Sequence, residues 1–185
     1  ILFSFDLSTN VLRGDEDTDI VLVERKDAPN IQSIVMNQVS GALNTGNYKA
    51  IALDNMSALQ NLVLENIDNA AKDNRQNYQK LQLWFRQLGT MLRESNVDVY
   101  ATAHQVDNGT SGLTAKGRYA ADMNEKTFNA FTSMFDFVGR IYKQDGQRWI
   151  NCDPEAGNHG KNRIDDRTQF KAEELLDPNE DKENE

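Results

Sequence analysis

Polar side chains follow three apolar runs of this sequence, each at the point where the run ends. Asp6 follows the run ILFSF, Asp54 follows AIAL, and the pair His104-Gln105 follows VDVYATA. In an open parallel sheet, ligands bind beyond the carboxyl ends of the strands, so strand ends of this kind are where chemistry is expected. A carboxylate there can hold Mg²⁺ through an oxygen or a water, and a second acid nearby can polarise an attacking water. A glutamine at the next strand end can donate a hydrogen bond to a terminal phosphate.

Simpler roles are open for each of these residues taken alone. Asp54 precedes an expected helix near Ser57 to Glu65, where an aspartate is a common N-cap. His104 can be a structural histidine whose ring nitrogens are satisfied by neighbouring groups. A zinc site built from His104, Cys152 and His159 has suitable residue types, but the spacing of the three matches no zinc motif.

The apolar runs themselves predict buried strands of a parallel sheet. They are ILFSF at 1–5, IVLVE at 20–24, AIAL at 50–53 and VDVYATA at 97–103, and none alternates strictly with polar residues. Such runs are typical of strands that are covered on both faces.

Helical periods lie between these runs. One follows Pro29, which suits a first helical turn, and stops at Gly46-Asn47. The apolar stripe of this helix comprises Ile31, Ile34, Val35, Val39, Ala42 and Leu43. A later helix has an apolar stripe of Leu81, Trp84, Phe85, Leu88, Met91 and Leu92. Both stripes are expected to pack in the core. The alternation of strands and helices predicts an α/β fold with a mainly parallel sheet flanked by helices.

The sequence changes in character after His104. Residues 106–123 are rich in Gly, Asn, Thr and Asp and are expected to form a long loop, and a short helix with Phe128, Phe131 and Phe135 follows. The segments FVGRIY and RWINC, around Asp145-Gly146, predict a C-terminal β-hairpin. We therefore expect one domain over residues 1–170 and an acidic, disordered tail over residues 171–185.

Composition sets the broad class of the protein. With 185 residues the chain is long enough for one domain with a hydrophobic core. The formal net charge of -9 argues against a protein coated in basic patches, although a local basic groove can bind nucleic acid on an acidic body. No apolar run reaches the roughly 18–20 residues that span a bilayer, and one cysteine allows no intrachain disulfide. We expect no membrane partner and a cytoplasmic location.

Over most of residues 1–165 the sequence resembles the RecA-like P-loop ATPases, in particular phage-encoded nucleotide-binding proteins of single-strand annealing and recombination. The resemblance is carried by ILFSFD, YKAIALDN, NYQKLQLWFRQLGTML, VDVYATAHQ, MFDFVGRIY and GKNR. It implies a RecA-like core that uses ATP and Mg²⁺, with Asp54 as the magnesium residue and Asp6 as the acid that activates water. It also implies that Gln105, together with His104, couples the state of the nucleotide to the loop that follows.

The resemblance further implies partners and, if the chain is phage-encoded, a location in the cytoplasm of the bacterial host. Lys161 and Arg163 match a Lys-x-Arg pair that reaches the nucleotide of a neighbouring subunit, which implies a homo-oligomeric ring or filament. The segment 106–123 corresponds to a loop that contacts single-stranded DNA, where Lys116 and Arg118 would contact phosphates and Tyr119 would stack on a base.

One departure from the family pattern matters. The sequence contains no G-x-x-x-x-G-K-[ST] motif, the loop that cradles phosphates. In this fold that loop precedes the strand assigned to ILFSF, so we expect it in a portion of the protein before Ile1. Two alternatives stay open: a DNA-binding or oligomerisation scaffold that does not hydrolyse ATP, and a helicase-type motor on the same core.

Overall fold

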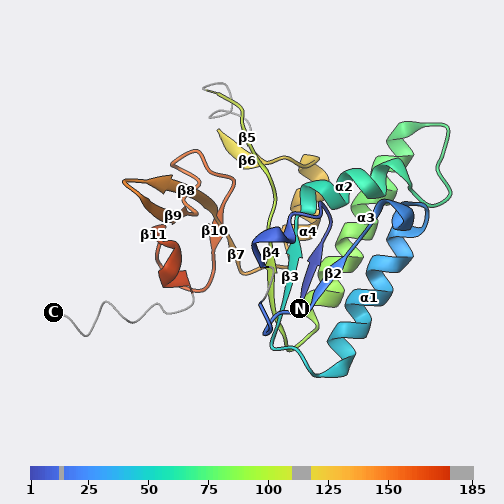
Figure 1. Cartoon of the computed structure of the whole chain (residues 1–185). Helices are drawn as coiled ribbons and strands as arrows, with labels where there is room; N and C mark the ends of the chain where they lie inside the picture. The colour runs from blue at the N-terminus through green and yellow to red at the C-terminus, as the bar shows by residue number, and fades with distance from the viewer. Residues whose placement is uncertain (13–14, 110–117, 176–185) are drawn as a thin grey trace. The chain divides into compact units, whose positions relative to one another are not determined.

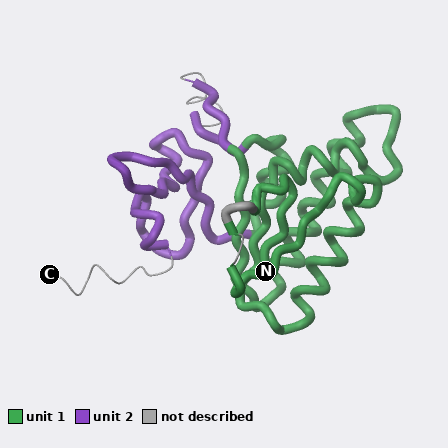
Figure 2. The backbone as a smooth tube through the Cα atoms, in the orientation of Figure 1, with its two compact units in different colours: residues 1–104, 122–134 green, residues 105–121, 135–185 purple. Residues whose placement is uncertain are grey.

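The computed structural model describes residues 1–12, 15–109 and 118–175. The chain divides into two compact units (Figure 2). Unit 1 comprises residues 1–104 and 122–134, and unit 2 comprises residues 105–121 and 135–185. Among the described residues, no helix is long and apolar enough to cross a membrane.

Unit 1 is built on a parallel sheet of four strands in the order β2-β1-β3-β4 (Figure 1). The strands are β1 (Leu2–Ser4), β2 (Ile20–Leu22), β3 (Ala50–Asp54) and β4 (Asp98–Ala101). Each apolar run of the sequence supplies one of them, so the predicted parallel sheet is confirmed. The register of β1 on β3 pairs Leu2 with Ala52 and Ser4 with Asp54. This register brings the carboxyl ends of the two central strands to the same edge.

The described part of unit 1 has four α-helices: α1 (Ile31–Thr45), α2 (Met56–Glu65), α3 (Asn74–Arg93) and α4 (Glu125–Thr132). Side chains of Asn55, Asp73 and Asn124 cap the last three, each by accepting a hydrogen bond from a backbone N–H of the first turn. Gly46 ends α1 with a φ of 66°, a left-handed conformation that glycine adopts without a steric penalty. Pro29 lies in a separate 3₁₀ helix, Arg25–Asn30, and not in the first turn of α1 as its position predicted.

The core of unit 1 consists of side chains from the sheet and the helices, and α1, α2 and α3 lie beside the sheet (Figure 1). The most buried side chains include Phe3, Ile31, Val35, Val39, Ile51, Leu53, Met56, Leu59, Val63, Leu81, Phe85, Leu88 and Phe131. The ring of Phe85 packs edge-on against Trp84 at 5.1 Å and against Phe131 of α4 at 5.8 Å. Burial of a side chain of this size contributes about 1.5–3 kcal/mol, so the predicted stripes are what holds the helices on the sheet.

Unit 2 consists of short antiparallel ladders. Strands β8 (Arg140–Gln144), β9 (Gln147–Asn151) and β11 (Gln169–Lys171) form one sheet, and β7 (Phe137–Val138) pairs with β10 (Lys161–Asn162). β8 and β9 meet at Asp145 and Gly146, which have φ values of 51° and 81°, as a two-residue hairpin turn requires. A 3₁₀ helix, Ala172–Leu175, follows β11.

The segment expected to be one long loop contains a third ladder. Strand β5 (Gln105–Asp107) pairs antiparallel with β6 (Tyr119–Ala121), while residues 110–117 lie outside the described residues. The expectation of a loop was therefore wrong for its two ends. The ladder is formed by backbone hydrogen bonds, beside an exposed ion pair between Arg118 and Asp107. A polar sequence without alternation gives little sign of either.

Candidate functional site

Asp54 and Asp6 lie at the carboxyl edge of the parallel sheet in unit 1. The backbone N–H of Phe5 donates to the carbonyl oxygen of Asp54 at 2.7 Å, which joins the ends of β1 and β3 just before Asp6. Thr102 continues the pairing of β4 with β3 through its N–H, and its hydroxyl donates to Oδ1 of Asp54. The Ser8 hydroxyl lies 3.4 Å from Oδ2 of the same carboxylate. The structure thus brings together the two acids that the sequence placed at strand ends.

Asp6 is held as a carboxylate by neutral donors. Its Oδ1 accepts from the backbone N–H of Ser8 at 3.0 Å, and its Oδ2 accepts from Nδ2 of Asn55 at 2.6 Å. Burial alone would raise the pKa of Asp6, but the hydrogen bonds from Ser8 and Asn55 and the nearby His104 outweigh it, so this pKa lies below its usual value of 3.8. Asp6 is therefore ionised at neutral pH.

Asn55 is a site residue that the sequence reasoning missed. It caps α2 by accepting from the N–H of Ala58 at 2.9 Å, so the alternative that Asp54 is the N-cap was wrong. The cap belongs to the residue after the strand, and this leaves the Asp54 carboxylate to face the hydroxyls of Thr102 and Ser8. An asparagine directly before a helical period is a recognised N-cap signal and could have been noticed.

His104 joins the same group of residues. Its backbone N–H donates to the hydroxyl of Ser57 at 3.0 Å, which ties the end of β4 to the first turn of α2. Its ring atom Nε2 lies 3.2 Å from Nδ2 of Asn55. In the described part of the chain, no group of three His, Cys, Asp or Glu side chains has the geometry to hold a metal by itself.

Gln105, Arg118 and Tyr119 belong to unit 2, and Lys116 lies outside the described residues. Nε of Arg140 donates to Oε1 of Gln105 at 2.6 Å. Arg118 forms a two-pronged pair with Asp107, with Nε at 3.0 Å from Oδ1 and Nη2 at 3.1 Å from Oδ2. The ring of Tyr119 has the guanidinium of Arg140 at 3.5 Å and that of Arg118 at 4.9 Å from its centre. The ring of Tyr119, which was predicted to stack on a DNA base, therefore already has the guanidinium of Arg140 stacked on it.

The basic pair, Lys161 and Arg163, also lies in unit 2, at β10. Lys161 pairs with Val138 of β7, and the backbone N–H of Arg163 donates to the carbonyl oxygen of Asp136 at 2.9 Å. The Arg163 guanidinium donates to the carbonyl oxygen of Phe135 at 2.6 Å and lies 3.5 Å from Oδ1 of Asp136. More than half of the Arg163 side chain, 53%, is still exposed, so it can be reached from solution.

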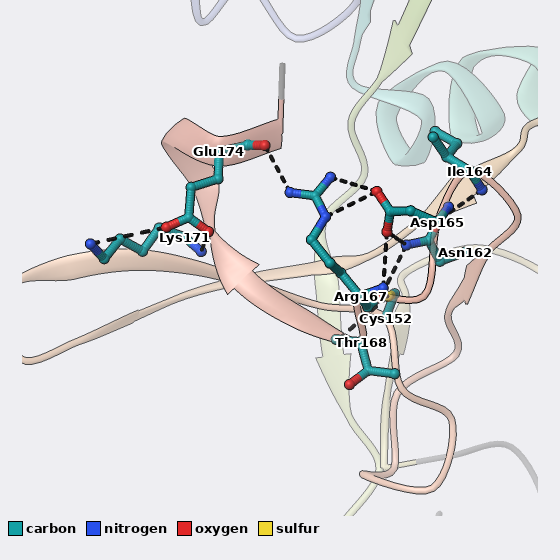
Figure 3. A network of polar contacts seen from close by, with 8 residues as sticks. All are labelled: Cys152, Asn162, Ile164, Asp165, Arg167, Thr168, Lys171 and Glu174. Atoms are coloured by element: carbon teal, nitrogen blue, oxygen red, sulfur yellow. Dashed lines mark hydrogen bonds and ion pairs between the residues drawn. The ribbon is translucent and has the colours of Figure 1, made fainter. Parts of the chain in front are cut away.

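A polar network holds the chain on the C-terminal side of the basic pair (Figure 3). Asn162 donates through Nδ2 to Oδ1 of Asp165 and to the carbonyl oxygen of Arg167, both at 2.8 Å. Arg167 donates to Oδ2 of Asp165 at 2.9 and 2.8 Å and, through Nη1, to the carbonyl oxygen of Glu174 at 2.9 Å. The hydrogen bonds from Arg167 lower the pKa of Asp165 to about 2. The turn that follows the basic pair is thus tied to the end of the described chain.

Two groups of predicted site residues therefore emerge, one in each unit. Asp6, Asp54 and His104 meet in unit 1, and Gln105, Arg118, Tyr119 and the basic pair belong to unit 2. A protein-family model described as an AAA domain matches residues 1–164. No curated protein matches the chain.

Proposed function

The chain belongs to the AAA-domain family, which indicates a nucleotide-binding ATPase, and from that premise we propose that it is the RecA-like ATPase of a phage-type DNA recombination protein. In this proposal Mg-ATP binding and hydrolysis control the binding or annealing of single-stranded DNA. The observation that carries the ATPase part is the pair of strand-end carboxylates, Asp6 and Asp54, at one edge of the parallel sheet.

The acids of unit 1 fit the metal side of a Mg-nucleotide site. Mg²⁺ in such sites is held by one or two carboxylates, with phosphate and water oxygens as its other ligands, so a protein cluster of three ligands is not needed. Among the described residues, no Lys or Arg forms an ion pair with Asp6 or Asp54, and their hydrogen-bond donors are neutral hydroxyl, amide and backbone groups. Two carboxyl groups without an ion-paired Lys or Arg favour a divalent cation.

The roles of the two acids follow from their positions. Asp54 would hold Mg²⁺, whose charge offsets that of the phosphates and polarises them toward attack. Asp6, kept ionised by Ser8 and Asn55, would orient the attacking water as its hydrogen-bond acceptor. His104 and Gln105, at the end of β4 and the start of β5, would respond to the terminal phosphate.

The basic pair supports an assembly of several subunits. Arg163 is partly exposed, and its segment is braced by the network around Asp165 and Arg167 (Figure 3). A guanidinium suits bidentate contact with a phosphate, and a cation supplied in this way contributes roughly 10³–10⁵ in rate in well-studied GTPases. We propose that Lys161 and Arg163 complete the nucleotide site of a neighbouring copy in a ring or filament.

The segment from Gln105 to Ala121 is the proposed contact with single-stranded DNA. Arg118, just before β6, and Arg140 of β8 place two cations against the ring of Tyr119 of β6. Single-strand binding uses this combination, with cations for the backbone and rings for bases. Lys116 would add a further phosphate contact.

The test is ATP hydrolysis by the full-length protein with Mg²⁺, with and without single-stranded DNA. Asp54→Ala is expected to lower turnover by roughly 10²-fold or more, because a bound metal contributes several kcal/mol to catalysis. Asp98→Ala is the matched control, since Asp98 is an exposed aspartate at the amino end of β4, away from the carboxyl edge. Turnover that rises with DNA and is lost only in Asp54→Ala would support the proposal.

Two other outcomes would contradict parts of it. Protein that binds DNA or assembles but never hydrolyses ATP would be a scaffold and would reduce Asp54 to a structural residue. Processive strand displacement with a fixed polarity would identify a helicase-type motor instead of an annealing protein.

A further inference from the structure

The side chain of Asn55 forms hydrogen bonds in three directions at the carboxyl edge of the sheet. It is 3% exposed. Its Oδ1 accepts from the backbone N–H of Ala58 at 2.9 Å, and its Nδ2 lies 2.6 Å from Oδ2 of Asp6 and 3.2 Å from Nε2 of His104. A single amide therefore links the start of α2, the end of β1 and the end of β4.

The orientation of this amide follows from its partners. A backbone N–H can only donate, so the atom facing Ala58 must be the oxygen. The Asp6 carboxylate can only accept, so the atom facing it must be the nitrogen. Both requirements give the same orientation, and exchanging the two atoms would break both hydrogen bonds. The amide nitrogen, with two hydrogens, thus faces Asp6 with one and His104 with the other.

This orientation decides the state of the His104 ring. A hydrogen bond from Nδ2 of Asn55 requires a lone pair on Nε2, and a neutral imidazole with a lone pair on Nε2 carries its hydrogen on Nδ1. A hydrogen on Nε2 would instead point at the amide hydrogens. His104 is exposed, and among the described residues none forms a hydrogen bond with Nδ1. Nδ1–H is then a donor on the side of the exposed ring that faces away from Asn55, where a ligand can accept from it.

We propose that Asn55 is a positioning residue that holds His104 in the Nδ1–H tautomer and so presents a fixed hydrogen-bond donor to a phosphate oxygen of the nucleotide. The part that concerns phosphate rests on the proposed ATPase function, whereas the tautomer does not. The same amide directs Oδ2 of Asp6, so the acid and the donor are set by one side chain. In this role Asn55 acts through its two neighbours, Asp6 and His104.

The tautomer can be measured directly by NMR of the imidazole nitrogens at pH 8, where an ordinary histidine is neutral. The chain contains only two histidines, and His104→Gln identifies the signals of His104 by their loss. We expect Nδ1 of His104 to be the protonated nitrogen, although neutral histidine in solution favours a hydrogen on Nε2. A wild-type protein with the hydrogen on Nε2 would overturn the proposal.

Asn55→Asp is the decisive variant. It keeps an oxygen to cap Ala58, so α2 retains its first turn, and it replaces the donor that faces both His104 and Asp6 with an acceptor. The variant is made together with Asp6→Asn and compared with Asp6→Asn alone, so that the new carboxylate faces an amide and not a second carboxylate. We expect the populations to reverse, from mostly Nδ1–H to mostly Nε2–H. An unchanged ring in Asn55→Asp, with α2 intact by amide chemical shifts, would show that Asn55 does not hold the tautomer.

Addition of Mg-ATP separates the two parts of the inference. A shift of the Nδ1 signal of His104 in wild-type protein but not in Asn55→Asp would support the phosphate contact. An unmoved Nδ1 signal in protein that hydrolyses Mg-ATP would refute that contact. If the protein neither binds nor hydrolyses Mg-ATP, the proposed function fails, and the ring signals without nucleotide still decide the role of Asn55.

Discussion

Replacement of Asp165 by asparagine tests whether the network of unit 2 stabilises the fold through charge (Figure 3). The Asp165 carboxylate accepts from the side chain and the backbone N–H of Arg167 and from Asn162. These bonds, led by that from the Arg167 side chain, outweigh desolvation and lower the pKa of Asp165 from 3.8 to about 2. A group with a lowered pKa in the folded state stabilises that state above its unfolded pKa and loses this contribution as the pH falls.

The size of the effect follows from the same values. A change in pKa from 3.8 to about 2 corresponds to roughly 2 kcal/mol at neutral pH. The Asp165 side chain is 28% exposed, so solvent screening reduces this figure, and we expect Asp165→Asn to cost about 1 kcal/mol of unfolding free energy at pH 7. The cost should shrink as the pH falls from about 4 toward 2, because the wild-type carboxyl group becomes protonated over this interval.

The measurement is urea denaturation followed by tryptophan fluorescence at several pH values. The two tryptophans lie in different units, so a Trp84→Phe background leaves Trp149 as the reporter of unit 2. Asp166→Asn is the matched control, since it removes the same charge from an exposed neighbour. Equal costs for the two variants, or a cost for Asp165→Asn that does not change with pH, would refute the reasoning.

Two further predictions concern buried side chains. Leu81→Ala should lower the free energy of unfolding by about 2–5 kcal/mol, because Leu81 is fully buried. Leu83→Ala, on the exposed face of α3, should lower it by less than about 1 kcal/mol. Equal shifts of the two variants in thermal denaturation would contradict the assigned core. Cys152 is 2% exposed, and burial raises the pKa of its thiol. A thiol reagent at pH 8 should therefore react with Cys152 much more slowly in the native protein than in urea. Equal rates would show that the thiol is accessible in the native protein.

Much of unit 1 could be predicted from local pattern. Runs without alternation predicted the four parallel strands, and apolar stripes predicted α1 and α3, since burial on a sheet imposes these periods on the sequence. Gly46 was expected to end α1, and the structure gives it the left-handed conformation that favours glycine. Unit 2 was less predictable, because strands of two to five residues in a polar sequence carry little periodic signal.

The candidate site could likewise be predicted from the sequence only in part. The order of strands and acids in the sequence was enough to place Asp6 and Asp54 at one edge, because the carboxyl ends of parallel strands meet there. Only the tertiary structure identified Asn55 as the helix cap and as the link between Asp6 and His104, each 49 positions away. Such contacts depend on strand register and on side-chain rotamers, which are set by the packed core and leave no periodic trace in the sequence. The sequence by itself therefore determined which groups reach the sheet edge, and the packed structure decided how they bond to one another.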